Sequence, residues 1–179
     1  LSVNPHFASH NLYFAHMKIS ILLFFLLLVS ASKSPLKILI LGDSLTDGFG
    51  VATAEAFPAL LETELLKKHP NTKVINGGSS GATTSSGLSR LRWYLKTKPT
   101  HLILALGSND GLRGLDVKAS SLNLEKIIQK AQSENITVIL AGLQIPPNYG
   151  PEYTKSFKKI IPALAKKYKL PLIPFLLEG

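Results

Sequence analysis

The chain of 179 residues contains no cysteine. It can therefore form no disulfide, no zinc–thiolate site and no cysteine nucleophile. Among 20 basic residues only three are arginines, and the sequence has neither an arginine-rich arm nor basic residues interleaved with aromatic ones. Those patterns are typical of nucleic-acid binding. We therefore expect no nucleic-acid partner, and we interpret the formal net charge of +9 as a solvated lysine surface.

The first 31 residues have the pattern of an export signal preceded by an extension. Met17-Lys18 supplies a positive charge, and residues 19–29 are apolar except for Ser20. Small residues that suit signal peptidase follow at 29–31. The apolar run is shorter than the roughly 20 residues that span a bilayer. We predict that residues 17–31 are a signal peptide for a periplasmic or secreted protein, with an N-terminal membrane anchor as the alternative. Residues 1–16 are then a non-native upstream extension.

From Leu36 onward, short apolar segments alternate with segments of helical periodicity. This alternation predicts a parallel sheet with helices on both faces. Strands that are apolar throughout fit burial from both sides. We therefore predict one α/β domain over residues 36–179, with three layers and a flavodoxin-like sheet of five parallel strands. The predicted strands are Lys37–Leu41, Lys73–Asn76, His101–Leu106, Ile136–Ala141 and Leu172–Leu176, and the predicted helices are Phe57–His69, Leu88–Lys96, Leu122–Gln132 and Tyr153–Lys167.

Glycine-containing turns end the first three predicted strands. They are Gly42–Leu45, Asn76–Thr83 and Gly107–Gly111. Because parallel strands end at one edge of the sheet, where α/β proteins bind ligands, we expect these turns to meet. A serine hydroxyl, a glycine N–H and an asparagine amide at such an edge could attack a carbonyl and stabilise the oxyanion that forms. Each turn alone has an ordinary explanation in helix capping or chain reversal, but their conjunction at three successive strand ends favours a shared site.

These turns resemble the motifs of the GDSL, or SGNH, hydrolase family. The letters S, G and N of that name would correspond to Ser44, Gly81 and Asn109. The resemblance covers nearly all of residues 36–179. It is strongest to the periplasmic branch of acyl-thioesterases, arylesterases and lysophospholipases, and it rests there on the runs Leu106–Gly114, Pro147–Gly150 and Leu170–Phe175.

The resemblance implies a serine hydrolase of carboxylic esters or thioesters that works through an acyl-enzyme on Ser44. It implies an oxyanion hole made by the N–H groups of Ser44 and Gly81 and by the side-chain amide of Asn109. It implies no metal and no organic cofactor. The implied partners are small-molecule esters, thioesters or lysophospholipids, with transient contact with membrane lipid.

The chain departs from the family at the catalytic base. The family takes its base from an Asp-x-x-His motif after the fifth strand, and no such motif occurs in this sequence. His6, His10 and His16 precede the predicted signal, His69 lies near a predicted helix end, and His101 opens the third strand at the edge opposite Ser44. We interpret all five as structural or incidental. We therefore expect the chain as given to hydrolyse esters poorly and to lack a final helix over one sheet face.

Two other functions stay open on the sequence. A flavodoxin-like sheet with glycine- and serine-rich turns could hold a phosphate or another ligand without catalysis. Against this, no G-x-G-x-x-G follows the first predicted strand, and the chain has no P-loop lysine. The second alternative is a protein that binds membrane surfaces through lysines of the last predicted helix. Those lysines are Lys155, Lys158, Lys159, Lys166 and Lys167.

Overall fold

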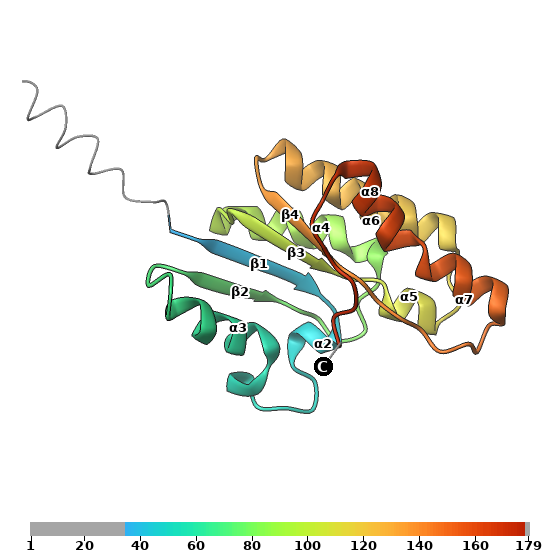
Figure 1. The fold of residues 1–179 in the computed structure, drawn as a ribbon, viewed down its shortest axis with the longest axis horizontal. Helices are drawn as coiled ribbons and strands as arrows, with labels where there is room; N and C mark the ends of the chain where they lie inside the picture. Colours follow the sequence, from blue (N-terminus) through green and yellow to red (C-terminus); the bar gives the residue numbers. More distant parts are fainter. Residues whose placement is uncertain (1–34, 178–179) are drawn as a thin grey trace, which may run out of the picture. The chain divides into compact units, whose positions relative to one another are not determined.

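A computed structural model describes residues 35–177 (Figure 1). Its centre is a sheet of five strands in the order β2-β1-β3-β4-β5, and every neighbouring pair is parallel. The predicted α/β fold with a parallel sheet is thereby confirmed. The strands are β1 (Lys37–Gly42), β2 (Lys73–Gly77), β3 (His101–Ala105), β4 (Thr137–Ala141) and β5 (Leu172–Ile173).

Helices cover the two faces of the sheet unequally. The helices of the described chain are α2 (Ser44–Asp47), α3 (Phe57–Leu66), α4 (Thr84–Tyr94), α5 (Ser108–Leu112), α6 (Val117–Ser133), α7 (Pro151–Lys158) and α8 (Ile160–Tyr168), with short 3₁₀ turns at Thr53–Glu55 and Leu95–Thr97. Figure 1 shows α3 beside β2, while α4, α6 and α8 lie along the other face. The short helices α2 and α5 directly follow β1 and β3, so they start at the carboxyl edge of the sheet.

Strand β1 contributes to both apolar layers of the domain. Its residues Leu39 and Leu41 pack with α4, α6, α7 and α8, whereas Ile38 and Ile40 face the layer under α3. Successive side chains of a strand point to opposite faces, so an unbroken apolar run fills two layers at once. Among residues 35–177, α3 is the helix that packs on the second face. The expectation that a further covering helix is missing stays a prediction.

The predicted helix Tyr153–Lys167 is wrong in one respect, because the structure divides it into α7 and α8 at Lys159. Pro162 explains the break. Its nitrogen carries no hydrogen, so it cannot donate to the carbonyl four residues earlier, at Lys158. The predicted fifth strand is likewise too long: β5 has two residues and lies between Pro171 and Pro174, neither of which can donate to a neighbouring strand.

The predicted signal peptide, residues 17–31, and the predicted extension, residues 1–16, lie outside the described residues. Within residues 35–177, no helix combines the length and the apolar character that crossing a bilayer requires.

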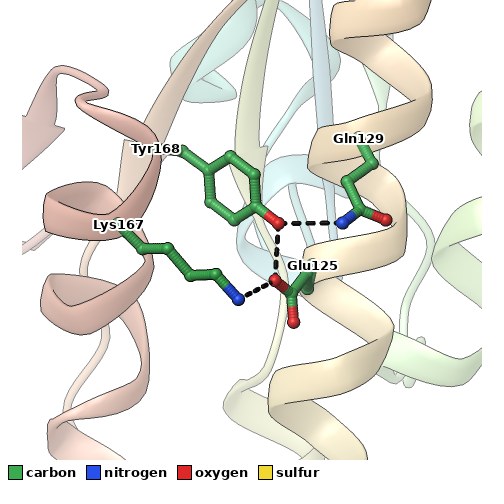
Figure 2. A network of polar contacts seen from close by, with 4 residues as sticks. All are labelled: Glu125, Gln129, Lys167 and Tyr168. Carbon is green, nitrogen blue, oxygen red and sulfur yellow. Dashed lines mark hydrogen bonds and ion pairs between the residues drawn. The ribbon is translucent and has the colours of Figure 1, made fainter.

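A polar cluster joins α6 to α8 (Figure 2). The Glu125 carboxylate of α6 accepts hydrogen bonds from the Lys167 ammonium group and the Tyr168 hydroxyl of α8. The side chain of Gln129 donates to the same tyrosine oxygen at 2.9 Å. The hydrogen bond from Lys167, and next that from Tyr168, hold the pKa of Glu125 below its ordinary value of 4.5.

The replacement Glu125→Gln should lower the thermal midpoint of unfolding at neutral pH. The folded-state pKa of Glu125 is depressed, so its charge contributes stability above pH 4.5, and this contribution disappears as the pH falls through the lowered pKa. Wild-type and variant midpoints should therefore converge in acid, as measured by circular dichroism. Glu134→Gln is the matched control, because it removes an ion pair with Lys130 at the C-terminal end of α6 that does not involve α8. Equal midpoints at neutral pH, or a gap that widens in acid, would contradict the assignment.

Candidate active site

The first loop places Ser44 half-buried at the carboxyl edge of the sheet. Strand β1 ends at Gly42, and Ser44 is the first residue of α2. Asp43 caps this helix, because its carboxylate accepts the Leu45 N–H at 3.1 Å. The helix packs directly on the strand end: a Cβ on Gly42 would lie 1.9 Å from the Thr46 hydroxyl oxygen. The position of Ser44 is therefore set by close packing of α2, through the Thr46 side chain, on the end of β1.

The second loop follows β2 and contacts α2. The N–H and the hydroxyl of Ser80 both donate to the Asp47 carboxylate, at 3.3 and 2.7 Å. A Cβ on Gly78 would lie 2.1 Å from the backbone nitrogen of Asp47, so any side chain there would displace the helix. The turn continues through Gly81, whose φ of +77° is a conformation that residues with a side chain rarely adopt.

The third loop follows β3 and is hydrogen-bonded to the second. Asn109 donates from its side-chain amide to the Ala82 carbonyl at 3.0 Å, and Arg113 donates to the Gly81 carbonyl at 3.1 Å. A side-chain amide has two N–H groups, so Asn109 keeps one for a ligand. The structure thus brings the loops of Ser44, Gly81 and Asn109 into one hydrogen-bonded unit, as expected for turns that follow parallel strands.

A buried carboxylate joins the third loop to the start of α4. Asp110 is 2% exposed and accepts from the N–H and the hydroxyl of Thr84 at 2.9 and 2.6 Å, and from the hydroxyl of Ser120 at 3.1 Å. Asn123 donates to the Thr84 hydroxyl oxygen at 3.2 Å. Sequence reasoning missed Asp110. The available signal was an acid next to Asn109 in a turn that is otherwise small and uncharged.

Arg90 of α4 joins the first two strand ends. Its guanidinium donates to the Gly42 carbonyl at 3.1 Å and to the Gly77 carbonyl. Burial lowers the pKa of Arg90 below its ordinary value. Burial raises the pKa of the neighbouring Asp43, although its hydrogen bond from Leu45 and the positive charge of Arg90 act in the opposite direction. Within the described residues, the second carboxylate oxygen of Asp43 has no hydrogen-bond partner.

Neither histidine of the described chain lies at this edge. His101 opens β3 at its amino end, where Nδ1 is 2.9 Å from the Thr100 hydroxyl oxygen. His69 is exposed just after α3. His6, His10 and His16 lie outside the described residues. Across residues 35–177, no three His, Cys, Asp or Glu side chains are grouped so that they could hold a metal ion.

Comparison with known proteins assigns the chain to a family. The model of the GDSL-like lipase/acylhydrolase family matches residues 40–179. The chain belongs to this family. The family predicted from the sequence is thereby confirmed.

Named relatives and solved structures agree with this membership. The arylesterase of Vibrio mimicus is 40% identical over 161 residues, which are 89% of this chain and 80% of the relative. The thioesterase 1/protease 1/lysophospholipase L1 of Escherichia coli K12 is 38% identical over 157 residues, 87% of this chain and 74% of that protein. The crystal structure of AlinE4, an SGNH-hydrolase family esterase, matches with a TM-score of 0.76 at 41% sequence identity. The match covers 82% of this chain and 79% of the AlinE4 chain.

The replacement Asp110→Asn should lower the free energy of unfolding by about 1–3 kcal/mol, because an amide NH₂ group replaces one acceptor oxygen and leaves a buried donor without its partner. Urea unfolding measures this difference. Asp116→Asn is the control with the same chemical change: Asp116 caps α6 through the Ala119 N–H, and asparagine caps a helix equally well. Equal stability of the two variants would show that Asp110 does not hold the loops together.

Proposed function

We propose that the chain is a serine hydrolase of carboxylic esters or thioesters and that Ser44 is its nucleophile. The observation that carries the proposal is the hydrogen-bonded junction of three loops at one sheet edge, which presents a half-buried serine, a glycine turn and an asparagine amide with a free N–H. Membership of an acylhydrolase family supports the same chemistry.

In the proposed reaction the Ser44 hydroxyl oxygen forms a bond to the acyl carbon while its proton passes to a base. The N–H groups of Ser44 and Gly81 and the free amide N–H of Asn109 donate to the oxyanion. Each such donor contributes roughly 10²–10³ in rate. The carbon–oxygen or carbon–sulfur bond to the leaving group then breaks, the leaving group takes up the proton, and water hydrolyses the acyl-enzyme.

The described residues provide no histidine as a catalytic base for Ser44. No histidine of residues 35–177 lies at the carboxyl edge, as described above. Loss of the base from a serine hydrolase typically costs about 10⁴–10⁶ in kcat. We therefore infer that the 179 residues by themselves turn esters over slowly.

The substrate we propose is a small ester, a thioester or a lysophospholipid. Exposed apolar side chains flank the Asn109 loop and suit a hydrocarbon chain: Leu112, Leu115 and Tyr149 are 49, 39 and 50% exposed. The Tyr149 hydroxyl donates to the Leu112 carbonyl at 3.2 Å, which holds the ring against this loop. The names of the relatives include arylesterase and lysophospholipase.

In protein expressed from the native gene, Ser44→Ala should lower kcat/KM for a p-nitrophenyl ester by about 10⁴ or more, because the acyl-enzyme cannot form. Asn109→Ala should lower kcat by about 10²–10³ with little change in KM, because its N–H binds the oxyanion and not the ground state. In the 179-residue chain Ser44→Ala should change little, since removal of one member of a catalytic set already removes most of its effect.

The exposed residues Ser89 and Asn71 provide controls, as Ser89→Ala and Asn71→Ala make the same changes in chemistry elsewhere. Both variants should keep wild-type rates. Undiminished turnover by Ser44→Ala in protein from the native gene would overturn the proposal and favour the alternative, a ligand-binding module without catalysis.

We further propose that the protein is exported, on the basis of residues 17–31. Sequencing of the mature N-terminus should find an end shortly after Ala31, because the small residues before it suit signal peptidase. A mature end upstream of Met17 would contradict both the signal and the predicted start.

A further inference from the structure

The outer side of α7 and α8 carries a concentrated positive charge. Its exposed residues form a groove of about 540 Å³, which we call the lysine face. Along the helices these residues follow one another at steps of three and one, so they lie on one stripe. The lysine face consists of Lys155, Lys158, Lys159, Pro162, Ala163 and Lys166.

The opposite side of the same helices is core. Phe157, Ile160, Ile161 and Leu164 are buried against the sheet and α6. The inner stripe therefore fixes which residues point outward, and the four lysines cannot fold back into the domain.

The charges of the lysine face are not neutralised within the described chain. The ion pairs found there involve four other lysines, at positions 67, 73, 130 and 167. Residues 151–168 contain five lysines and one acid, Glu152. Attraction to helix C-termini explains a lysine near the end of each helix. It does not explain the exposed Pro162 and Ala163 between the charges.

A second groove, of about 650 Å³, continues the lysine face toward α6 and shares Lys159 and Ala163 with it. Val117, Leu122 and Ile160 contribute apolar atoms to this groove. A mostly apolar strip thus runs beside the cations, and the acidic residues Asp116 and Glu152 also border it.

This combination favours a lipid surface over a nucleic acid. Nucleic-acid sites use arginine and aromatic side chains on which bases stack, and neither kind of residue lines the lysine face. Lysines bordering apolar side chains are the pattern of helices that lie on anionic membranes. We propose that the lysine face docks the protein on a bilayer that contains anionic phospholipid.

The docked face is close to the candidate active site. The Tyr153 hydroxyl of α7 donates to the Leu115 carbonyl at 2.7 Å, and the Phe157 ring lies against Gly111, within the loop that carries Asn109. The bilayer would therefore lie about one helix diameter, ~10 Å, from that loop. Docking does not depend on catalysis by Ser44.

Vesicle co-sedimentation of the full chain tests the proposal. One variant replaces Lys155, Lys158, Lys159 and Lys166 with glutamine. The matched variant replaces four exposed lysines elsewhere with glutamine, namely Lys67, Lys68, Lys73 and Lys98. The two variants therefore lose the same amount of positive charge. Vesicles contain phosphatidylcholine alone or mixed with equal parts of phosphatidylglycerol. The apolar run 19–29 is present in the wild type and in every variant, so any contribution it makes to vesicle binding cancels in the comparison.

The lysine-face variant should bind the anionic vesicles several hundred-fold more weakly than wild type, roughly 600-fold, because each of the four lysines near an anionic surface contributes about fivefold. The matched variant should lose only a few-fold. Replacement of the same four lysines with arginine should restore binding, which separates lost charge from lost folding.

Three results would overturn the proposal. Equal losses in the two glutamine variants would show that total charge, not the lysine face, governs binding. Equal wild-type binding to both kinds of vesicle would show that anionic lipid is not recognised. Loss of binding to a DNA duplex in the lysine-face variant, with vesicle binding unchanged, would assign the surface to nucleic acid.

Discussion

The buried Asp110 carboxylate is the contact on which the candidate site depends. It follows Asn109 directly, and through Thr84 it holds the first turn of α4. The second loop, with Gly81, leads into that turn. Two segments that reach the sheet edge from different strands are thus joined by charge-assisted hydrogen bonds away from water, which are stronger than neutral ones. This contact reinforces the hydrogen bonds from Asn109 to the Ala82 carbonyl and from Arg113 to the Gly81 carbonyl, which join the same two loops.

Sheet topology makes the contact possible. Strand β1 is flanked by β2 and β3, so the loops after these three strands begin side by side. Arg90, a residue of α4, donates hydrogen bonds to carbonyl groups at the ends of β1 and β2. The helix that Asp110 fixes at its first residue therefore also fixes the strand ends. Helix α4 is in this way the common support of the first three loops.

Much of this architecture could be predicted, because it depends on local pattern. The strands β1 to β4 were predicted to within about one residue at each end, since buried parallel strands are continuous apolar runs bounded by turns. The glycine turns indicated which strand ends would be joined at one edge of the sheet. The helix break at Lys159 could have been predicted from Pro162. The buried apolar stripe continues across the break, however, and its periodicity favoured one continuous helix.

The remaining features depend on contacts between distant residues. Asp110 and Thr84 are 26 positions apart, and Arg90 reaches a carbonyl 48 positions away. The spacing of apolar residues along the chain does not indicate which distant residues will form such contacts. Asp110 looks like a polar turn residue, and Arg90 looks like a solvated residue of an amphipathic helix, until the fold brings their partners to them.

The absent side chain at Gly78 has a consequence for how the protein loses its site on heating. The second loop meets the Asp47 backbone of α2 with no side chain between them, which allows Ser80 to donate two hydrogen bonds to the Asp47 carboxylate. Surface loops usually open at lower cost than the core beneath them. Here hydrogen bonds join the three loops to one another, so we expect the site to unfold together with the domain and not in a separate transition at lower temperature.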